Sequence, residues 1–253
     1  MTNRHTKILE VLSENKRMEV TALAELLDVS QVTIRKDLDQ LEEKGLIRRE
    51  HGYASIDLVD DVGKRLAYHY TIKKRIAQAA AVSVQDGETV MIESGSCCTL
   101  LAEELANTKR DVTIVTNSAF IANHIRYAPH GKIILLGGYY QKESQVLVGP
   151  LTRKCAEIFF ADKFFIGVDG FMEKTGFTGN DHLRAQTVQD LAEQVRQILV
   201  LTDSEKFSHQ GMVGLVRISD VDAVYTDDKI PADIEAHLTE RNITVCKVSS
   251  KGA

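Results

Sequence analysis

The first sixty residues contain three short stretches in which apolar residues recur every three or four positions. Such spacing places the apolar side chains on one face of a helix. Only Asp28, Val29 and Ser30 separate the second stretch from the third, and a turn this short holds two helices at a steep angle. The pattern therefore predicts a helix-turn-helix. The residues that define the three helices are Ile8, Leu9, Val11 and Leu12, then Leu23, Leu26 and Leu27, and then Ile34, Leu38 and Leu41.

The third predicted helix has recognisable ends and is followed by a predicted hairpin. Ser30 is placed as the N-cap, and Gly45 is placed as the C-terminal stop. Residues 46–49 and 54–56 then read as two short strands joined by a turn. A hairpin in this position is the wing of a winged helix-turn-helix. We therefore expect residues 1–57 to form a small helical DNA-binding domain with a β wing.

The exposed face of the third helix carries side chains that hydrogen-bond base edges or phosphates. They lie in the first turns, which is the part of a recognition helix that enters the major groove. A solvated charged face is the alternative, but the basic residues are concentrated and most of the acids lie further along the helix. Asp37 is expected to pair with an arginine inside the domain. The predicted DNA-contacting residues are Ser30, Gln31, Thr33, Arg35 and Lys36 on the helix, and Arg48, Arg49 and His51 on the wing.

The rest of the chain alternates between β-type runs and helical ones. Residues 58–71 lack a clean period and are expected to form a linker, and a helix is expected from Ile72 to about Val84. Continuous apolar strands separated by helices are typical of a parallel sheet covered on both faces. We therefore expect residues 72–253 to form an α/β domain with a mainly parallel sheet. The predicted strands are 89–92, 112–116, 133–136, 163–168, 198–202, 223–226 and 243–248.

Small and polar residues follow several of these predicted strands. Ligands of parallel α/β sheets bind at the carboxyl ends of the strands. After the first strand, Gly95 permits close approach of the backbone, and hydroxyl groups beside a helix start suit a phosphate. A plain tight turn is the alternative, but several polar strand ends at one edge favour a pocket. The predicted effector-binding residues are Glu93, Ser94, Gly95, Ser96, Cys97, Thr99, Thr116, Asn117, Gly137, Gly138, Asp169 and Lys206.

Composition and charge narrow the class of protein. The 253 residues are 43% hydrophobic and 26% charged, which is ordinary for a soluble globular protein. A net charge of −5 argues against a protein that coats nucleic acid non-specifically, although a small basic surface can still bind a specific sequence. The chain lacks an apolar run long enough to span a membrane, and its N-terminus lacks a signal-peptide core. We therefore expect a cytoplasmic protein without a membrane partner.

The four cysteines do not form a zinc or redox motif. None belongs to a C-x-x-C pair, and no histidine cluster lies at metal-ligand spacing, so no metal and no cofactor are expected. Cys97 and Cys98 stand at a predicted helix start, where a thiol pKa can fall. A redox role stays open for them, but packing or ligand contact is favoured.

Two sets of residues resemble the DeoR family of bacterial regulators. In the N-terminal part these are Arg4, Ile8, Leu12, Ser30 and the run from Thr33 to Leu38. In the C-terminal part the family's acid-Ser-Gly loop, Thr-Asn pair, Gly-Gly pair and Asp-Ser-x-Lys motif are matched in order at 93–99, 116–117, 137–138 and 203–206. The chain departs from the family where Tyr53 replaces the second wing glycine, Glu93 replaces Asp and Cys97 replaces Thr.

The resemblance implies a fold similar to ribose-5-phosphate isomerase and a phosphorylated sugar as effector. We expect a repressor of a sugar or polyol catabolic operon that binds double-stranded operator DNA as a homodimer or homotetramer. A phosphorylated sugar or polyol would relieve the repression. The alternative is an active sugar-phosphate isomerase fused to a DNA-binding module, with Asp169 or Glu93 as base and Lys206 as electrophile. A sensor without catalytic residues is favoured, because no second carboxylate can be placed with assurance after Asp169.

Overall fold

The computed structural model describes residues 3–43, 46–55 and 62–250. The chain divides into two compact units, residues 1–71 and 72–253, which are described separately. The predicted stop at Gly45 lies outside the described residues. The N-terminal unit contains α1 (Asn3–Asn15), β1 (Arg17–Glu19), α2 (Val20–Leu26), α3 (Gln31–Glu43), β2 (Arg48–Glu50), β3 (Tyr53–Ser55) and α4 (Val62–Ala67).

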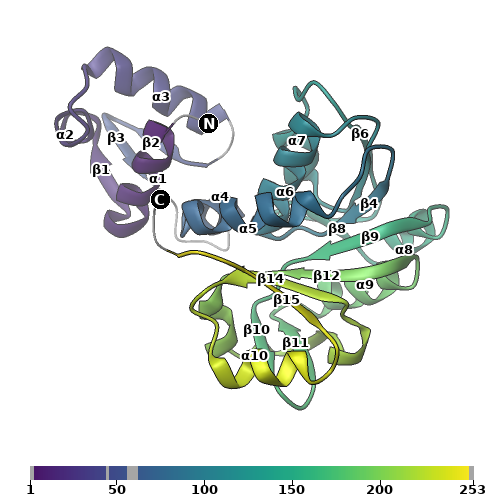
Figure 1. The fold of residues 1–253 in the computed structure, drawn as a ribbon. Helices are drawn as coiled ribbons and strands as arrows, with labels where there is room; N and C mark the ends of the chain where they lie inside the picture. The colour runs from purple at the N-terminus through teal and green to yellow at the C-terminus, as the bar shows by residue number, and fades with distance from the viewer. Residues whose placement is uncertain (1–2, 44–45, 56–61, 251–253) are drawn as a thin grey trace. The chain divides into compact units, whose positions relative to one another are not determined.

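Helices α2 and α3 form the predicted helix-turn-helix, drawn with α1 in Figure 1. Asp28 in the turn between them has a left-handed backbone, with a φ of 50°. The backbone N–H of Thr33 donates to the Ser30 hydroxyl at 3.1 Å, which confirms Ser30 as the N-cap of α3. The apolar positions of α3 are buried as predicted. The buried apolar residues of α2 and α3 are Val20, Leu23 and Ala24, and Ile34, Leu38 and Leu41.

A three-stranded antiparallel sheet completes this arrangement, in the order β1-β3-β2. Strands β2 and β3 form a hairpin in which Glu50 pairs with Tyr53. His51 and Gly52, between them, both have positive φ, at 46° and 84°. A two-residue loop of this kind is a type I′ turn, whose twist matches that of the strands. Histidine therefore occupies a left-handed position that glycine would adopt without strain.

The C-terminal unit alternates strands and helices over its length. Its helices are α5 (Tyr70–Val82), α6 (Ser96–Thr108), α7 (Ala119–His124), α8 (Pro150–Ala156), α9 (His182–Ala192) and α10 (Ala232–Thr239), with 3-10 turns η1 (Ser204–Ser208) and η2 (Ile218–Asp220). Its main strands are β4 (Thr89–Ile92), β5 (Thr113–Thr116), β6 (Lys132–Leu135), β9 (Ala161–Ile166), β12 (Val195–Leu201), β14 (Ala223–Asp227) and β15 (Thr244–Val248). The boundary between the two units falls within α5, after Thr71.

The seven main strands form one parallel sheet in the order β15-β14-β12-β9-β4-β5-β6. All seven predicted strands are present, and the parallel sheet is confirmed. Side chains of α8, α9 and α10 belong to the core on one face, together with Phe164 and Val200 of the central strands. Figure 1 shows α5, α6 and α7 on the other side of the sheet. Two helical layers therefore cover it, as continuous apolar strands require.

Smaller antiparallel elements accompany the main sheet and were not predicted. Strands β7 (Tyr139–Gln141) and β8 (Val146–Val148) form a hairpin. Strands β10 (Gly170–Met172), β11 (Gly176–Gly179) and β13 (Val213–Val216) form a second sheet. Helix α4 lies inside the stretch expected to be a linker. Among the described residues, no helix is long and apolar enough to cross a membrane.

Candidate functional site

Helix α3 presents three of its predicted DNA-contacting side chains to solvent. Gln31, Arg35 and Lys36 are exposed, and Thr33 is half-buried beside the N-cap. Within the described part of the chain, neither Arg35 nor Lys36 forms an ion pair with another residue. Their charges therefore remain available to a partner outside the chain. These positions lie in the first two turns of a 13-residue helix whose opposite face is buried.

Asp37 lies on the inner side of α3 and binds two basic residues of α1. It is 5% exposed, and its carboxylate accepts hydrogen bonds from the Arg4 guanidinium and from His5 Nε2 at 3.1 Å. Burial opposes ionisation, but the bonds from Arg4 and His5 outweigh it and hold the pKa of Asp37 below its usual value. The predicted pairing of Asp37 with an arginine is confirmed. It ties the recognition helix to α1.

Replacing Asp37 by alanine should destabilise the N-terminal unit by about 2 kcal/mol. Removing one partner of a fully buried ion pair costs roughly 3–5 kcal/mol, and the cost is smaller here because the Arg4 side chain is 37% exposed and regains water. Hydrogen exchange of α3 amides measures the loss, with the sheet strands of the other unit as an internal reference. Asp39→Ala on the same helix is the control, since its 65% exposed carboxylate forms a surface pair with Arg49. Equal effects of the two variants would contradict this role of Asp37.

The hairpin residues predicted to contact DNA differ in their environment. Arg48 and His51 are exposed, and His51 stands in the turn. Arg49 is turned towards α3, where its guanidinium binds Asp39 and its backbone N–H donates to Glu42 at 2.9 Å. Arg49 therefore fastens the hairpin to the helix. Its pairing with Asp39 could not be predicted from the sequence, and the expected contact of Arg49 with DNA stays a prediction.

In the C-terminal unit, the predicted effector residues follow five strands that are adjacent in the sheet. Strands β12, β9, β4, β5 and β6 are neighbours and all run parallel, so their carboxyl ends share one edge. The loop after β4 begins with two buried polar residues, Glu93 and Ser94. Glu93 is 8% exposed, and its carboxylate accepts bonds from Ser94 Oγ and from the Gly167 N–H at 3.3 Å. Glu93 thus locks this loop to the end of β9.

Gly95 is required by the packing of two loops. A Cβ at Gly95 would lie 2.9 Å from Gly167 Cα, which is closer than real Cβ contacts. Because this position is also the N-cap of α6 and supplies no side chain, the first N–H groups of that helix have no capping partner on it. Ser96 is half-buried there, and the Thr99 N–H donates to the carbonyl of the N-cap Gly95 at 2.9 Å. The helix start thus combines free N–H groups with positive helix-dipole potential.

Cys97 and Cys98 in the first turn of α6 are buried thiols. Burial raises the pKa of the Cys97 thiol to about 12 and raises that of Cys98 as well. Cys98 Sγ contacts the Phe165 carbonyl at 3.6 Å. Both groups are therefore neutral at physiological pH. A low-pKa redox thiol, which the helix start left open, does not occur here.

Several of the predicted effector residues are used to build the edge. Thr99 Oγ1 donates to the Gly95 carbonyl at 3.1 Å, and Thr116 Oγ1 donates to the Ile92 carbonyl at 2.6 Å. Asn117 Nδ2 donates to Leu147 O at 3.1 Å, whereas its buried Oδ1 has no partner among the described residues. Asn117 is therefore the one of these three that retains an unmet acceptor.

Gly137, Gly138 and Asp169 also have structural partners. A Cβ at Gly138 would lie 2.0 Å from Thr152 Oγ1, and that hydroxyl donates to the Gly137 carbonyl at 2.8 Å. The Asp169 carboxylate accepts from the Asn180 N–H at 3.0 Å. The two glycines thus accommodate α8, and Asp169 links the segment after β9 to the end of β11.

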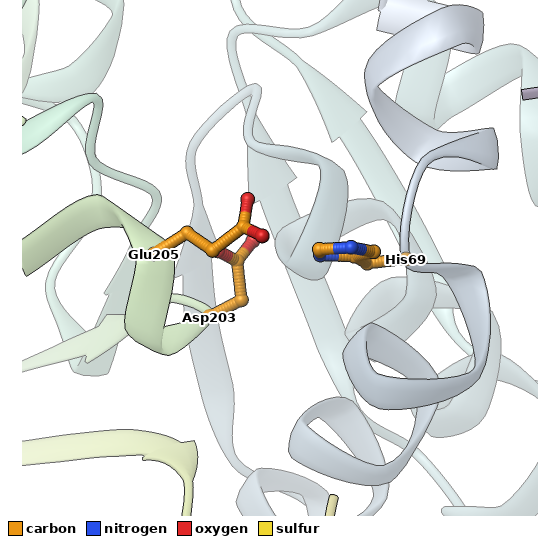
Figure 2. A group of neighbouring side chains, drawn as sticks. All are labelled: His69, Asp203 and Glu205. Atoms are coloured by element: carbon orange, nitrogen blue, oxygen red, sulfur yellow. The ribbon is translucent and has the colours of Figure 1, made fainter. Parts of the chain in front are cut away.

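Asp203, which follows β12, is a candidate that sequence reasoning undervalued as a helix cap. Its side chain makes no capping bond to η1, it is 4% exposed, and its Oδ1 has no partner among the described residues. Figure 2 shows the carboxylates of Asp203 and Glu205 directed towards the same space, with oxygens within 4.8 Å of each other. His69, also drawn there, belongs to the N-terminal unit. Asp203 therefore offers a buried acceptor at the sheet edge.

Four charged side chains act electrostatically on the Cys97 thiol in the first turn of α6. Burial is the largest cause of the raised pKa of the Cys97 thiol; Asp203 and Asp227 raise that pKa further, whereas Lys73 and Lys206 lower it. The loops after β4 and β12 lie at the same edge of the sheet, with the end of β9 between them. Lys73 was missed by sequence reasoning. The signal for it was a lysine in phase with the alanines of α5.

Comparison with known proteins decides the family. Residues 4–58 match the DeoR-like helix-turn-helix domain, and residues 68–228 match the DeoR C terminal sensor domain. The chain belongs to the DeoR family. It is therefore a DNA-binding transcriptional regulator, and its α/β unit is a sensor domain rather than an enzyme.

Relatives of this DeoR-family chain match it over nine-tenths or more of its length. It is 31% identical over 245 residues to the glycerol-3-phosphate regulon repressor of Escherichia coli (strain K12). This match covers 96% of this chain and 97% of that protein. It is 30% identical to the HTH-type transcriptional regulator GolR of Listeria innocua, over 90% of this chain and 91% of that protein. Among solved structures, ribose 5-phosphate isomerase A from Methanocaldococcus jannaschii is similar with a TM-score of 0.40 and 17% identity, over 55% of each chain.

Proposed function

We propose that this regulator is a repressor of a sugar or polyol catabolic operon. Helix α3 would enter the major groove, with Gln31, Thr33 and Arg35 at base edges and with Ser30 and Lys36 at phosphates. The observation that carries this assignment is the exposure of Arg35 and Lys36 without an internal ion pair. The β2–β3 hairpin would act as the wing, with Arg48 and His51 on the DNA backbone. Arg49 would support it from behind.

The effector of this repressor would be a phosphorylated sugar or polyol bound at the sheet edge. The free N–H groups of α6, with Ser96 beside them, would take the phosphate together with Lys206. The unpartnered oxygens of Asp203 and Asn117 would accept hydroxyl hydrogens of the carbon chain. Glu93, Ser94, Gly95, Thr99 and Thr116 would hold the shape of the site, and so would Gly137, Gly138 and Asp169. The names of the relatives support this class of ligand.

The neutral Cys97 thiol would influence which ligand the site binds. The resemblance to the family places threonine at this position, and a buried thiol is a weaker hydrogen-bond donor than a hydroxyl. We therefore expect the ligand to make fewer polar contacts at this point than in relatives with threonine.

Two or more copies of the chain would bind one operator, because a single small module buries too little surface for specific affinity.

Two experiments test this function. Selection of duplexes from randomised DNA by the full chain should enrich a motif with repeated half-sites, and Lys36→Ala should weaken binding to all enriched sequences alike. In a thermal-shift panel, each phosphorylated sugar or polyol is paired with its unphosphorylated form. Only phosphorylated compounds should raise the thermal stability of the C-terminal unit. A chain that enriches no motif, or that responds equally to both forms, would contradict the proposal.

A further inference from the structure

Val32, the second residue of α3, exposes an apolar side chain at the start of the recognition helix. It is 79% exposed. The other apolar residues of α3 are buried, namely Ile34, Leu38 and Leu41. With 3.6 residues in each turn, Val32 lies on the side of the helix directly opposite this buried line. Its side chain therefore points away from the core of the N-terminal unit.

The stability of α3 does not call for valine at this position. A β-branched side chain loses rotamer freedom in a helix, so an exposed valine is a weaker helix former than alanine, glutamate or lysine. An acid in the first turn would stabilise the helix through its dipole, yet residues 31–34 contain none. The start of α3 is thus suited to a partner that carries negative charge and also presents an apolar group.

The neighbours of Val32 on the exposed surface are two cations. Arg35 and Lys36 follow it by three and four residues, which places all three side chains on adjoining positions of the helix. The major groove of DNA combines phosphates with base edges that hydrogen-bond such cations. It also presents one apolar group, the C5-methyl group of thymine. This combination matches the surface that Val32, Arg35 and Lys36 form.

We propose that Val32 reads the C5-methyl group of a thymine in each operator half-site. This inference rests on the proposed entry of α3 into the major groove, and it adds a base and the residue that selects it. Val32 precedes Arg35 by about 4.5 Å along the helix axis. Base pairs are spaced roughly 3.4 Å apart. The thymine therefore lies within one or two base pairs of the base that Arg35 contacts.

Deoxyuridine in place of thymine tests this contact, because uracil lacks only the C5-methyl group. The duplex is the one that the full chain enriches from randomised DNA, and each thymine of the half-site is replaced in turn, in both half-sites together. At the thymine that Val32 contacts, wild-type affinity should fall roughly 15-fold by fluorescence anisotropy. The estimate follows from a loss of about fourfold for one methyl group in each of two half-sites.

Variants of Val32 identify the residue that makes the contact. Val32→Ser removes both methyl branches, so its affinities for the thymine and uracil duplexes should differ by less than about twofold at that position. Val32→Ile should retain the preference for thymine. Because Val32 is not part of the core, and serine and valine have similar helix propensities, the serine variant should fold normally. Leu26→Ala is the matched control, since Leu26 is 59% exposed on α2, and its sensitivity to uracil should equal that of the wild type.

Three results would overturn the assignment of Val32 alone. Wild-type affinity that no change from thymine to uracil alters, or an enriched half-site without thymine, would show that no methyl group is read. Equal sensitivity to uracil in Val32→Ser and in the wild type would show that another residue makes the contact. In each case the enriched motif still supports the proposed DNA-binding function. A chain that enriches no motif would overturn that function and the assignment of Val32 together.

Discussion

Replacing Arg35 by alanine should lower operator affinity roughly 100-fold and leave effector affinity unchanged. A bidentate arginine–guanine contact contributes about 1–3 kcal/mol of discrimination, and two half-sites would double the loss. Fluorescence anisotropy of a labelled duplex measures this loss of affinity. The substitution should also relax the base preference at one position of each half-site. Because Arg35 is exposed and is not part of the core, the variant should fold normally.

The matched control for Arg35→Ala is Gln40→Ala. Gln40 is also exposed on α3 but lies beyond the first turns of the helix. Its replacement should change operator affinity by less than about threefold, because it would lie away from the base edges. Wild-type affinity in Arg35→Ala, or an equal loss in both variants, would show that another element reads the sequence.

Replacing Lys206 by methionine should raise the dissociation constant of the phosphorylated effector roughly 10- to 100-fold. A hydrogen bond to a charged group contributes about 1.5–3 kcal/mol, and methionine retains most of the volume of the lysine stem. Operator binding in the absence of effector should not change, so the variant should repress without being induced. Calorimetry on the full chain measures the affinity. Lys229→Met is the control, because Lys229 is an exposed lysine that follows β14 at the same end of the sheet. Equal affinities for the two variants would place the phosphate elsewhere.

Period and order along the chain were enough to predict the main architecture. Each of the seven sheet strands contains a short apolar run, and the runs alternate with helices, which favours a parallel sheet covered on both faces. The helix-turn-helix could also be predicted from the sequence, because Ser30 caps α3 and Ile34, Leu38 and Leu41 repeat at helical spacing. The burial of these apolar side chains follows from their spacing in the local sequence.

The small antiparallel elements could not be predicted in the same way. Strands β7, β8 and β10 have three residues each, too few for an alternating pattern to emerge. Strand β1 pairs with β3 across more than thirty residues, and its three residues carry no periodic signal. Pairing of this kind is decided by tertiary packing.

The candidate site shows the same division. The strand ends were predictable because a parallel sheet brings its carboxyl ends to one edge. What each polar side chain does there was not predictable, since Thr99 and Thr116 satisfy backbone carbonyls whereas Asp203 retains a free oxygen. Lys73 lies on a helix that precedes the sheet, and the sequence did not reveal that it is buried there. Likewise, the pairing of Arg49 with Asp39 appears only once the two residues are placed in the structure.

The proposed function requires that a phosphorylated ligand at the sheet edge lowers the affinity of α3 for its operator. A single anisotropy titration tests it, with the full chain, the selected duplex and a saturating amount of the phosphorylated compound that stabilises the protein. We predict that the dissociation constant for the duplex rises roughly 5- to 150-fold, the range of typical allosteric couplings. The unphosphorylated counterpart should leave it unchanged. An operator affinity that is the same with and without the phosphorylated compound would contradict the account.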